Sequence, residues 1–202
     1  MAIDLHQPEM SFEEYLLNEA AASTKHEFVD GQLYAMAGAS RAHATIALNL
    51  AAFVRPAIRG SGCQAYIADM KVAPPGNRSV RYPDLVMTCD ERDLADEQIT
   101  RFPKLIVEVL SPGTSSVDRG DKFEEYRRIP TLEEYVIIDS TRVLVEIFRR
   151  ADDGWRLKEY GPGGIFRLES IPLEIRVDDL YEDVERGPLE QGVIDTKRYP
   201  RR

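Results

Sequence analysis

The pattern of apolar and polar positions predicts a chain that mixes short strands with a few amphipathic helices. Ser11 and Glu14 have the capping-box spacing that begins a helix. Asp30-Gly31 separates two extended runs and is typical of a hairpin turn. A longer helix is expected from about Ser40 to Ile58. Further strands are expected at 63–67, 69–73, 82–87, 104–110, 134–139, 144–149 and 155–160.

The expected elements favour an α+β fold in which helices flank a central mixed β-sheet. The run 104–110 is apolar on both faces, which is typical of a buried central strand. Its one carboxylate, Glu108, shares a face with Ile106 and Leu110. A structural ion pair with an arginine or lysine would account for a buried glutamate, and so would a bound ligand.

A lysine stands where the next helix should be apolar. At about 100° per residue, Lys122, Phe123, Tyr126 and Ile129 fall within one arc of a helix that begins near Asp118. Lys122 is therefore expected to point inward, unless its stem covers the edge of the core while its ammonium reaches water. Because an unpaired buried charge is costly, an inward lysine and an inward glutamate imply each other or a shared metal ion.

A third acid, Asp84, follows Pro83 at the start of another apolar run. Taken alone, an acid in this position is most often a turn or edge residue. Taken with Glu108, it offers the hard oxygen ligands that Mg²⁺ prefers, with Mn²⁺ as a substitute and the Val109 carbonyl completing the set. Such a metal activates water, and Lys122 would orient that water or neutralise charge on a phosphate. Asp118, at an i, i+4 spacing, would orient the lysine or cap its helix.

Composition limits the kind of protein. The 202 residues suit one domain, expected over 1–186, with a polar C-terminal tail at 187–202. No run approaches the roughly 18 apolar residues of a membrane span, and the N-terminus lacks a signal region. Cys63 and Cys89 lack metal-site spacing and are expected to be reduced, so a cytoplasmic protein is expected. The net charge of −9 argues mildly against nucleic-acid binding.

Several of these residues together resemble a known family. The matching segments are Pro83-Asp84, Val107-Glu108-Val109-Leu110-Ser111-Pro112, Asp118, Lys122, Tyr126, Glu134-Tyr135 and Ile138-Asp139. They resemble the PD-(D/E)XK nucleases, and more narrowly a branch of bacterial restriction-endonuclease-like proteins. The superfamily's lysine would fall at Leu110, but in this branch it comes from the following helix, which matches Lys122.

The resemblance implies a restriction-endonuclease-like core and a nuclease that cuts DNA, with a homodimer as a plausible assembly. It also implies that Glu27 lies at or beside the metal site, although a hairpin glutamate can equally face solvent. The same branch has a histidine on the next helix, matching His43, for which a core position is the expected role. The catalytic set is therefore expected to be Asp84, Glu108, Lys122 and Glu27, with Asp84, Glu108 and Val109 as metal ligands.

Two other functions are open. The acidic charge and the lack of an evident DNA-reading element favour a nuclease-fold binding module with little hydrolytic activity. A metal-dependent hydrolase of small phosphate esters would also tolerate an acidic surface. There is no Walker or Rossmann glycine loop, no nucleophile elbow and no zinc-type Cys/His cluster in the sequence.

Overall fold

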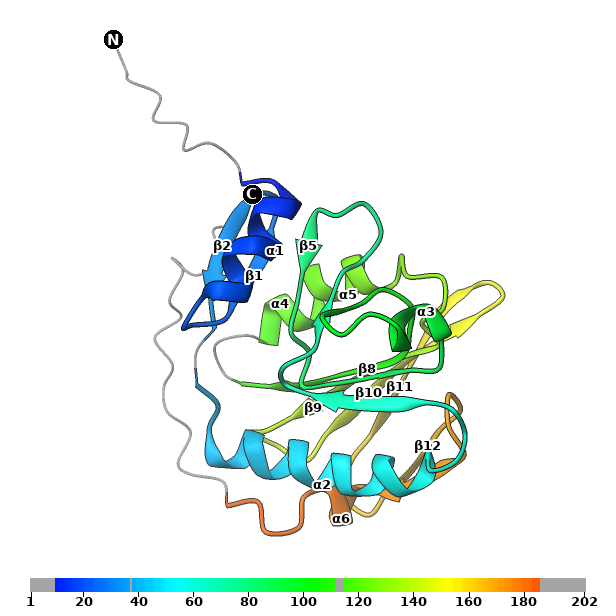
Figure 1. Cartoon of the computed structure of the whole chain (residues 1–202). Coiled ribbons are helices and arrows are strands. Elements are labelled where there is room, and N and C mark those ends of the chain that lie inside the picture. Colours follow the sequence, from blue (N-terminus) through cyan, green and yellow to red (C-terminus); the bar gives the residue numbers. More distant parts are fainter. Residues whose placement is uncertain (1–9, 37, 112–114, 186–202) are drawn as a thin grey trace.

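The computed structural model describes residues 10–36, 38–111 and 115–185, and a six-stranded mixed sheet lies at its centre (Figure 1). Its strands are β3 (Gln64–Ile67), β6 (Leu85–Thr88), β8 (Pro103–Leu110), β9 (Glu134–Asp139), β10 (Val145–Ala151) and β11 (Gly154–Tyr160). Their spatial order is β11-β10-β9-β8-β6-β3, with β8 and β9 parallel and the other pairs antiparallel. The expected α+β fold with a central mixed sheet is confirmed.

Helices cover both faces of this sheet (Figure 1). α2 (Arg41–Ala57) packs on one face, where its buried side chains meet those of β8; these are Ile46, Leu50, Val54, Leu105, Val107 and Val109. α4 (Ser115–Arg119) and α5 (Asp121–Tyr126) lie over the other face, where Tyr126 joins Ile106 and Leu110. The side chains of β8 alternate between two cores, as a central strand requires.

The helix expected from Asp118 is divided in two. Gly120, between α4 and α5, has φ −108° and ψ −92°, which is outside the helical region. Lys122, Tyr126 and Ile129 are nevertheless all buried, so the expected inward face of this segment is confirmed.

The N-terminal elements form a smaller unit. α1 (Phe12–Ala21) begins with the expected capping box of Ser11 and Glu14. The expected hairpin is β1 (His26–Val29) and β2 (Gln32–Ala35), whose turn places Asp30 and Gly31 at positive φ. β5 (Ser79–Val80) pairs with β1, so the three-stranded order is β2-β1-β5. Through β1, this unit contributes Glu27 to the buried charges described below.

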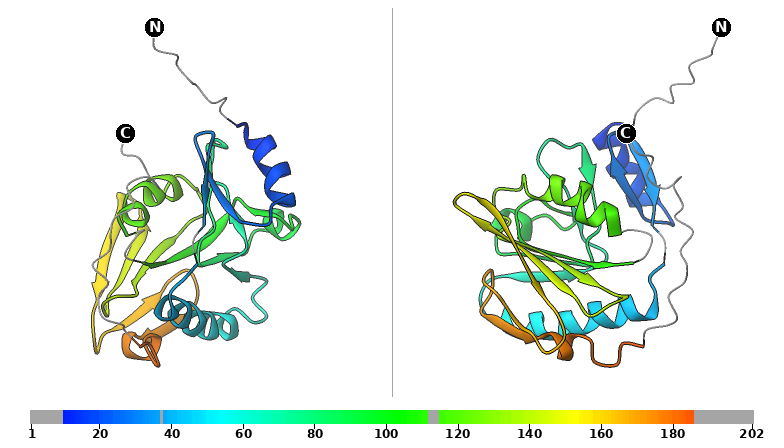
Figure 2. Two further views of the ribbon diagram at one scale, coloured as in Figure 1. Left: turned by 90° about the vertical axis from the view of Figure 1, so that its left-hand side faces the viewer. Right: turned by 180° about the vertical axis from the view of Figure 1, so that it is seen from behind.

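The sequence pattern gave no expectation for the elements after β11. β12 (Ile165–Leu168), β13 (Leu173–Arg176) and α6 (Val177–Leu180) pack beside α2, as the two further views show (Figure 2). Each of these two strands has only four residues, and at most two of its side chains are buried. A segment this short gives little evidence of the alternation of apolar and polar positions that predicts a strand. Phe166 and Leu180 extend the α2 core.

The other short elements lie in connections between the larger ones. They are β4 (Lys71–Val72), β7 (Ile99–Thr100) and α3 (Glu91–Leu94). No helix in the described ranges is long and apolar enough to cross a membrane. The expected tail at 187–202 and residues 112–114 of the loop after β8 lie outside the described residues.

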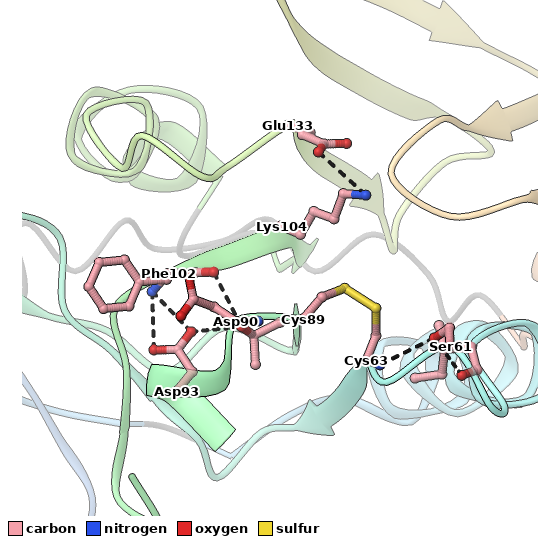
Figure 3. Close-up of a disulfide and its surroundings, with 10 residues drawn as sticks. Ser61, Cys63, Cys89, Asp90, Asp93, Phe102, Lys104 and Glu133 are labelled. Carbon is pink, nitrogen blue, oxygen red and sulfur yellow. Dashed lines mark hydrogen bonds and ion pairs between the residues drawn. A yellow bond between two sulfur atoms is a disulfide. The ribbon is translucent and has the colours of Figure 1, made fainter. Parts of the chain in front are cut away.

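The expectation of reduced cysteines is wrong. Cys63 and Cys89 form a disulfide that joins the ends of β3 and β6 (Figure 3). Gln64 pairs with Thr88, so the next position outward places the two cysteines directly opposite each other, with Cα atoms 4.1 Å apart. A separation of 26 residues in sequence carried no signal of this pairing because strand register creates it.

Candidate active site

Asp84 lies where β6 begins, against the end of β8. Its Oδ2 accepts a hydrogen bond from the Val109 backbone N–H at 2.7 Å, and His43 Nε2 is 2.7 Å from Oδ1. The Asp84 side chain is 20% exposed, so the site reaches the surface here. Asp84 is therefore held beside β8, rather than being a turn residue without a partner.

The preceding proline explains this contact. Leu85 pairs with Val107, so the register continues to Pro83 opposite Val109. Proline has no N–H and cannot donate to the Val109 carbonyl, and the Asp84 carboxylate accepts the Val109 N–H. Because the N–H and C=O of one strand residue point to the same side, the Val109 carbonyl also faces the Asp84 side of β8.

Glu108 and Lys122 meet as buried partners. Lys122 Nζ donates to Glu108 Oε1 at 3.0 Å, and the Tyr126 hydroxyl donates to the same oxygen at 3.1 Å. Lys122 Nζ is also 2.9 Å from Asp118 Oδ1 and 3.4 Å from Glu27 Oε1. The lysine side chain is only 8% exposed, so its ammonium does not reach out to water. Asp118 orients the lysine from within α4 rather than by capping a helix.

Glu27 is buried, so a solvent-facing position in the hairpin is wrong. Arg81 donates to Glu27 Oε2 at 3.0 Å and to both oxygens of Glu125 at 2.9 and 2.7 Å. Arg81 thereby connects β1 to α5, the helix that carries Lys122. Sequence reasoning missed Arg81 and Glu125, although Arg81 stands between Val80 and the expected strand 82–87 and was a signal of the same kind as Lys122.

Burial and neighbouring charges determine the protonation of this cluster. Burial has the largest effect on Glu108 and raises its pKa. Lys122 lowers this pKa, Asp118, Asp84 and Glu27 raise it, and the net result lies well above the usual range. Burial lowers the pKa of Lys122, but the surrounding carboxylates more than reverse this and hold it well above its usual value. Lys122 is therefore a permanent cation, and Glu108 favours a proton or a second cation.

His43 is not the core residue that was expected. It is half-buried in the first turn of α2, and its ring contacts Asp84 at 2.7 Å. The structure therefore brings His43 to Asp84, and it brings Glu27 and Lys122 to Glu108. The two groups adjoin through neighbouring positions of β8, because Val109 binds Asp84 and Glu108 binds Lys122.

The oxygen groups at this point suit a hard divalent cation. Within the described ranges no set of three or more His, Cys, Asp or Glu side chains is arranged to hold a metal. Mg²⁺ needs fewer, because it keeps several waters and binds through one or two carboxylates. Both donors to Glu108 bind Oε1, and no described donor bonds to Oε2. Asp84, Glu108 and the Val109 carbonyl therefore form a suitable set of cation ligands. The carboxylates around them outnumber the two buried cations, Lys122 and Arg81, so the cluster carries excess negative charge.

Known proteins are similar to this chain over most of its length. A family model named Uma2, described as "Putative restriction endonuclease", matches residues 12–178, a range that includes every site residue named above. Two uncharacterized proteins of Synechocystis sp. are similar in sequence. One is 38% identical over 175 residues, covering 86% of this chain and 92% of the relative. The other is 34% identical over 149 residues, covering 72% and 84%.

The fold is also similar to that of a protein with a solved crystal structure. It is titled as "a putative nuclease belonging to DUF820" from Anabaena variabilis. The TM-score is 0.71 at 15% identity, over 85% of this chain and 97% of that chain. At this identity the likeness shows the fold alone.

Proposed function

This chain belongs to the Uma2 family, and from that premise we propose that it is a Mg²⁺-dependent endonuclease that hydrolyses phosphodiester bonds in DNA. The observation that carries the proposal is the meeting of charges at the end of β8. Glu108 is bound there by a buried lysine, and the next residue binds Asp84. Buried charge of this kind is costly for stability, which favours a chemical role for it.

Each residue has a part in this proposal. Asp84, Glu108 and the Val109 carbonyl would hold the cation. When bound, a divalent cation stabilises charge on a phosphate and lowers the pKa of water. Tyr126 and Lys122 fix the Glu108 carboxylate through bonds to one of its oxygens. Glu108 therefore keeps one orientation during the reaction.

Lys122 supplies the permanent positive charge at the site. Because its pKa lies well above the usual value, the ammonium stays protonated at neutral pH. We infer that this ammonium neutralises negative charge that develops on the reacting phosphate. Asp118 and Glu27 hold the lysine from two sides, which is the part that Glu27 plays in the catalytic set.

The net charge of −9 bears on substrate binding. An acidic surface repels a phosphate backbone, so we expect weak non-specific binding to DNA. A bound divalent cation offsets part of this repulsion locally. Cleavage rather than affinity for DNA is therefore the informative measurement.

The test is cleavage of supercoiled plasmid and of single-stranded DNA by the purified protein with Mg²⁺ or Mn²⁺, beside EDTA. We expect nicking that needs the metal and is abolished in Lys122→Ala. Lys104→Ala is the matched control, because Lys104 pairs with Glu133 at the surface and should be dispensable (Figure 3). Circular dichroism verifies that each variant is folded at the assay temperature.

Three results would contradict the proposal. Full cleavage by Lys122→Ala would remove the lysine from the mechanism. No cleavage of any DNA by the folded protein would favour the binding module. Metal-dependent release of phosphate from small esters, without DNA cleavage, would favour the small-substrate hydrolase.

A further inference from the structure

We propose that His43 is a positioning residue that fixes the Asp84 carboxylate for cation binding. This inference rests on the proposed function, since it concerns the same site. It starts from one geometric fact: both oxygens of Asp84 are held, Oδ1 by His43 Nε2 and Oδ2 by the Val109 N–H, each at 2.7 Å. Two contacts from different elements fix the plane of the carboxylate.

The position of the imidazole is itself fixed by the sequence of α2. Ser40 caps this helix, and its hydroxyl oxygen accepts a hydrogen bond from the His43 backbone N–H at 3.2 Å. The helix is then anchored in the core by Ile46 and Leu50. A side chain in the first turn of such a helix has little freedom to move, so the ring presents Nε2 to Asp84 from a rigid support.

The second ring nitrogen shows that packing alone does not account for this residue. His43 Nδ1 is buried and has no hydrogen-bond partner among the groups that the structure describes. A buried polar atom without a partner is unfavourable, and an apolar residue of similar volume would avoid that cost. The contact of Nε2 with Asp84 is the interaction that an apolar residue could not supply.

Glutamine and asparagine can each replace histidine, but they place their side-chain amide nitrogen at different distances from the backbone. The side-chain nitrogen of glutamine can occupy the place of His43 Nε2, whereas that of asparagine corresponds to Nδ1 and is too short to reach Asp84. His43→Gln therefore keeps the bond to Asp84, and His43→Asn and His43→Leu remove it. All three replacements are smaller than or similar in size to histidine.

The experiment measures Mn²⁺ binding by isothermal titration calorimetry in the absence of DNA. Outer residues that orient a metal ligand typically contribute about 10–100-fold in affinity, so we expect that loss in His43→Leu and His43→Asn, with His43→Gln within about threefold of the unaltered protein. His26→Leu is the matched control. His26 also pairs with a carboxylate, Glu19, at 3.1 Å, but not with Asp84. Its loss should leave Mn²⁺ affinity unchanged.

The outcomes separate this inference from the proposed function. Equal affinities of the Gln and Asn variants would overturn the role of His43 while leaving a metal-dependent nuclease intact. Absence of Mn²⁺ binding by the unaltered protein would overturn both. If His43→Leu does not fold, the comparison of His43→Gln with His43→Asn still decides, because both are polar and differ in reach.

Discussion

Replacing Lys122 by methionine tests whether the buried charges form one network. Methionine keeps the length and apolar stem of lysine and removes only the ammonium. That ammonium is 3.0 Å from Glu108, 2.9 Å from Asp118 and 3.4 Å from Glu27, and the side chain is 8% exposed. The variant therefore leaves three carboxylates without the cation that they share.

The expected cost is large because the remaining charges are buried. Removing one partner of a buried ion pair costs about 3–5 kcal/mol, whereas an exposed pair contributes about 0–1 kcal/mol. Lys104 offers the exposed comparison: it lies 3.4 Å from Glu133, and their side chains are 33% and 48% exposed. With about 2–4 °C per kcal/mol for a domain of this size, Lys122→Met should lower Tm by about 6–20 °C.

Urea denaturation followed by circular dichroism measures both variants under the same conditions. A double variant sharpens the test, since Glu108→Gln removes one of the charges that Lys122→Met leaves without a cation. Lys122→Met/Glu108→Gln should therefore be more stable than Lys122→Met alone, with a coupling of about 0.5–3 kcal/mol. If Lys122→Met costs no more than Lys104→Met, the buried network is not a feature of the folded protein and the reasoning fails.

Three further predictions concern other parts of the structure. Reducing the Cys63–Cys89 disulfide, or replacing Cys63 by serine, should lower the free energy of unfolding by about 3 kcal/mol, because the bond closes a loop of 26 residues; identical urea curves with and without reductant would contradict this. Tyr126→Phe removes the donor to Glu108 at 3.1 Å and should cost about 1–2 kcal/mol, measured in the same assay; an unchanged midpoint would show that the bond contributes nothing. Burial raises the pKa of Asp139, but bonds from Thr141 and Arg142 outweigh it and hold the pKa below its usual 3.8. The charged Asp139 carboxylate therefore stabilises the fold fully above its usual pKa of 3.8, and this stabilisation is lost as pH falls through the lowered pKa. Asp139→Asn should lower the free energy of unfolding at pH 7, and its stability should converge with that of the unaltered protein in strong acid.

Local sequence pattern predicted the central features of the site. The burial of Glu108 followed from apolar residues on both faces of one strand, and the inward position of Lys122 followed from its place on a helical face. Both are properties of single elements, because side-chain direction repeats every 2 residues in a strand and every 3.6 residues in a helix. The structure shows the two side chains 3.0 Å apart. Their role in catalysis stays a prediction.

Contacts between distant elements were not predictable in this way. Arg81 joins Glu27 to Glu125, and these residues come from three different segments of the chain. His43 meets Asp84 only because α2 packs across the sheet with its first turn at the start of β6. In each case the packing of the elements and the register of the strands determine which side chains form an ion pair or hydrogen bond.

The sequence by itself therefore determined the burial of Glu108, the inward position of Lys122 and the elements that carry them, because periodicity is recorded along the chain. Only the tertiary structure decided which charge meets which. Strand register placed Pro83 opposite Val109 and Cys63 opposite Cys89. A shift of one residue would turn every such side chain to the other face, so these contacts depend on the packing of the whole sheet.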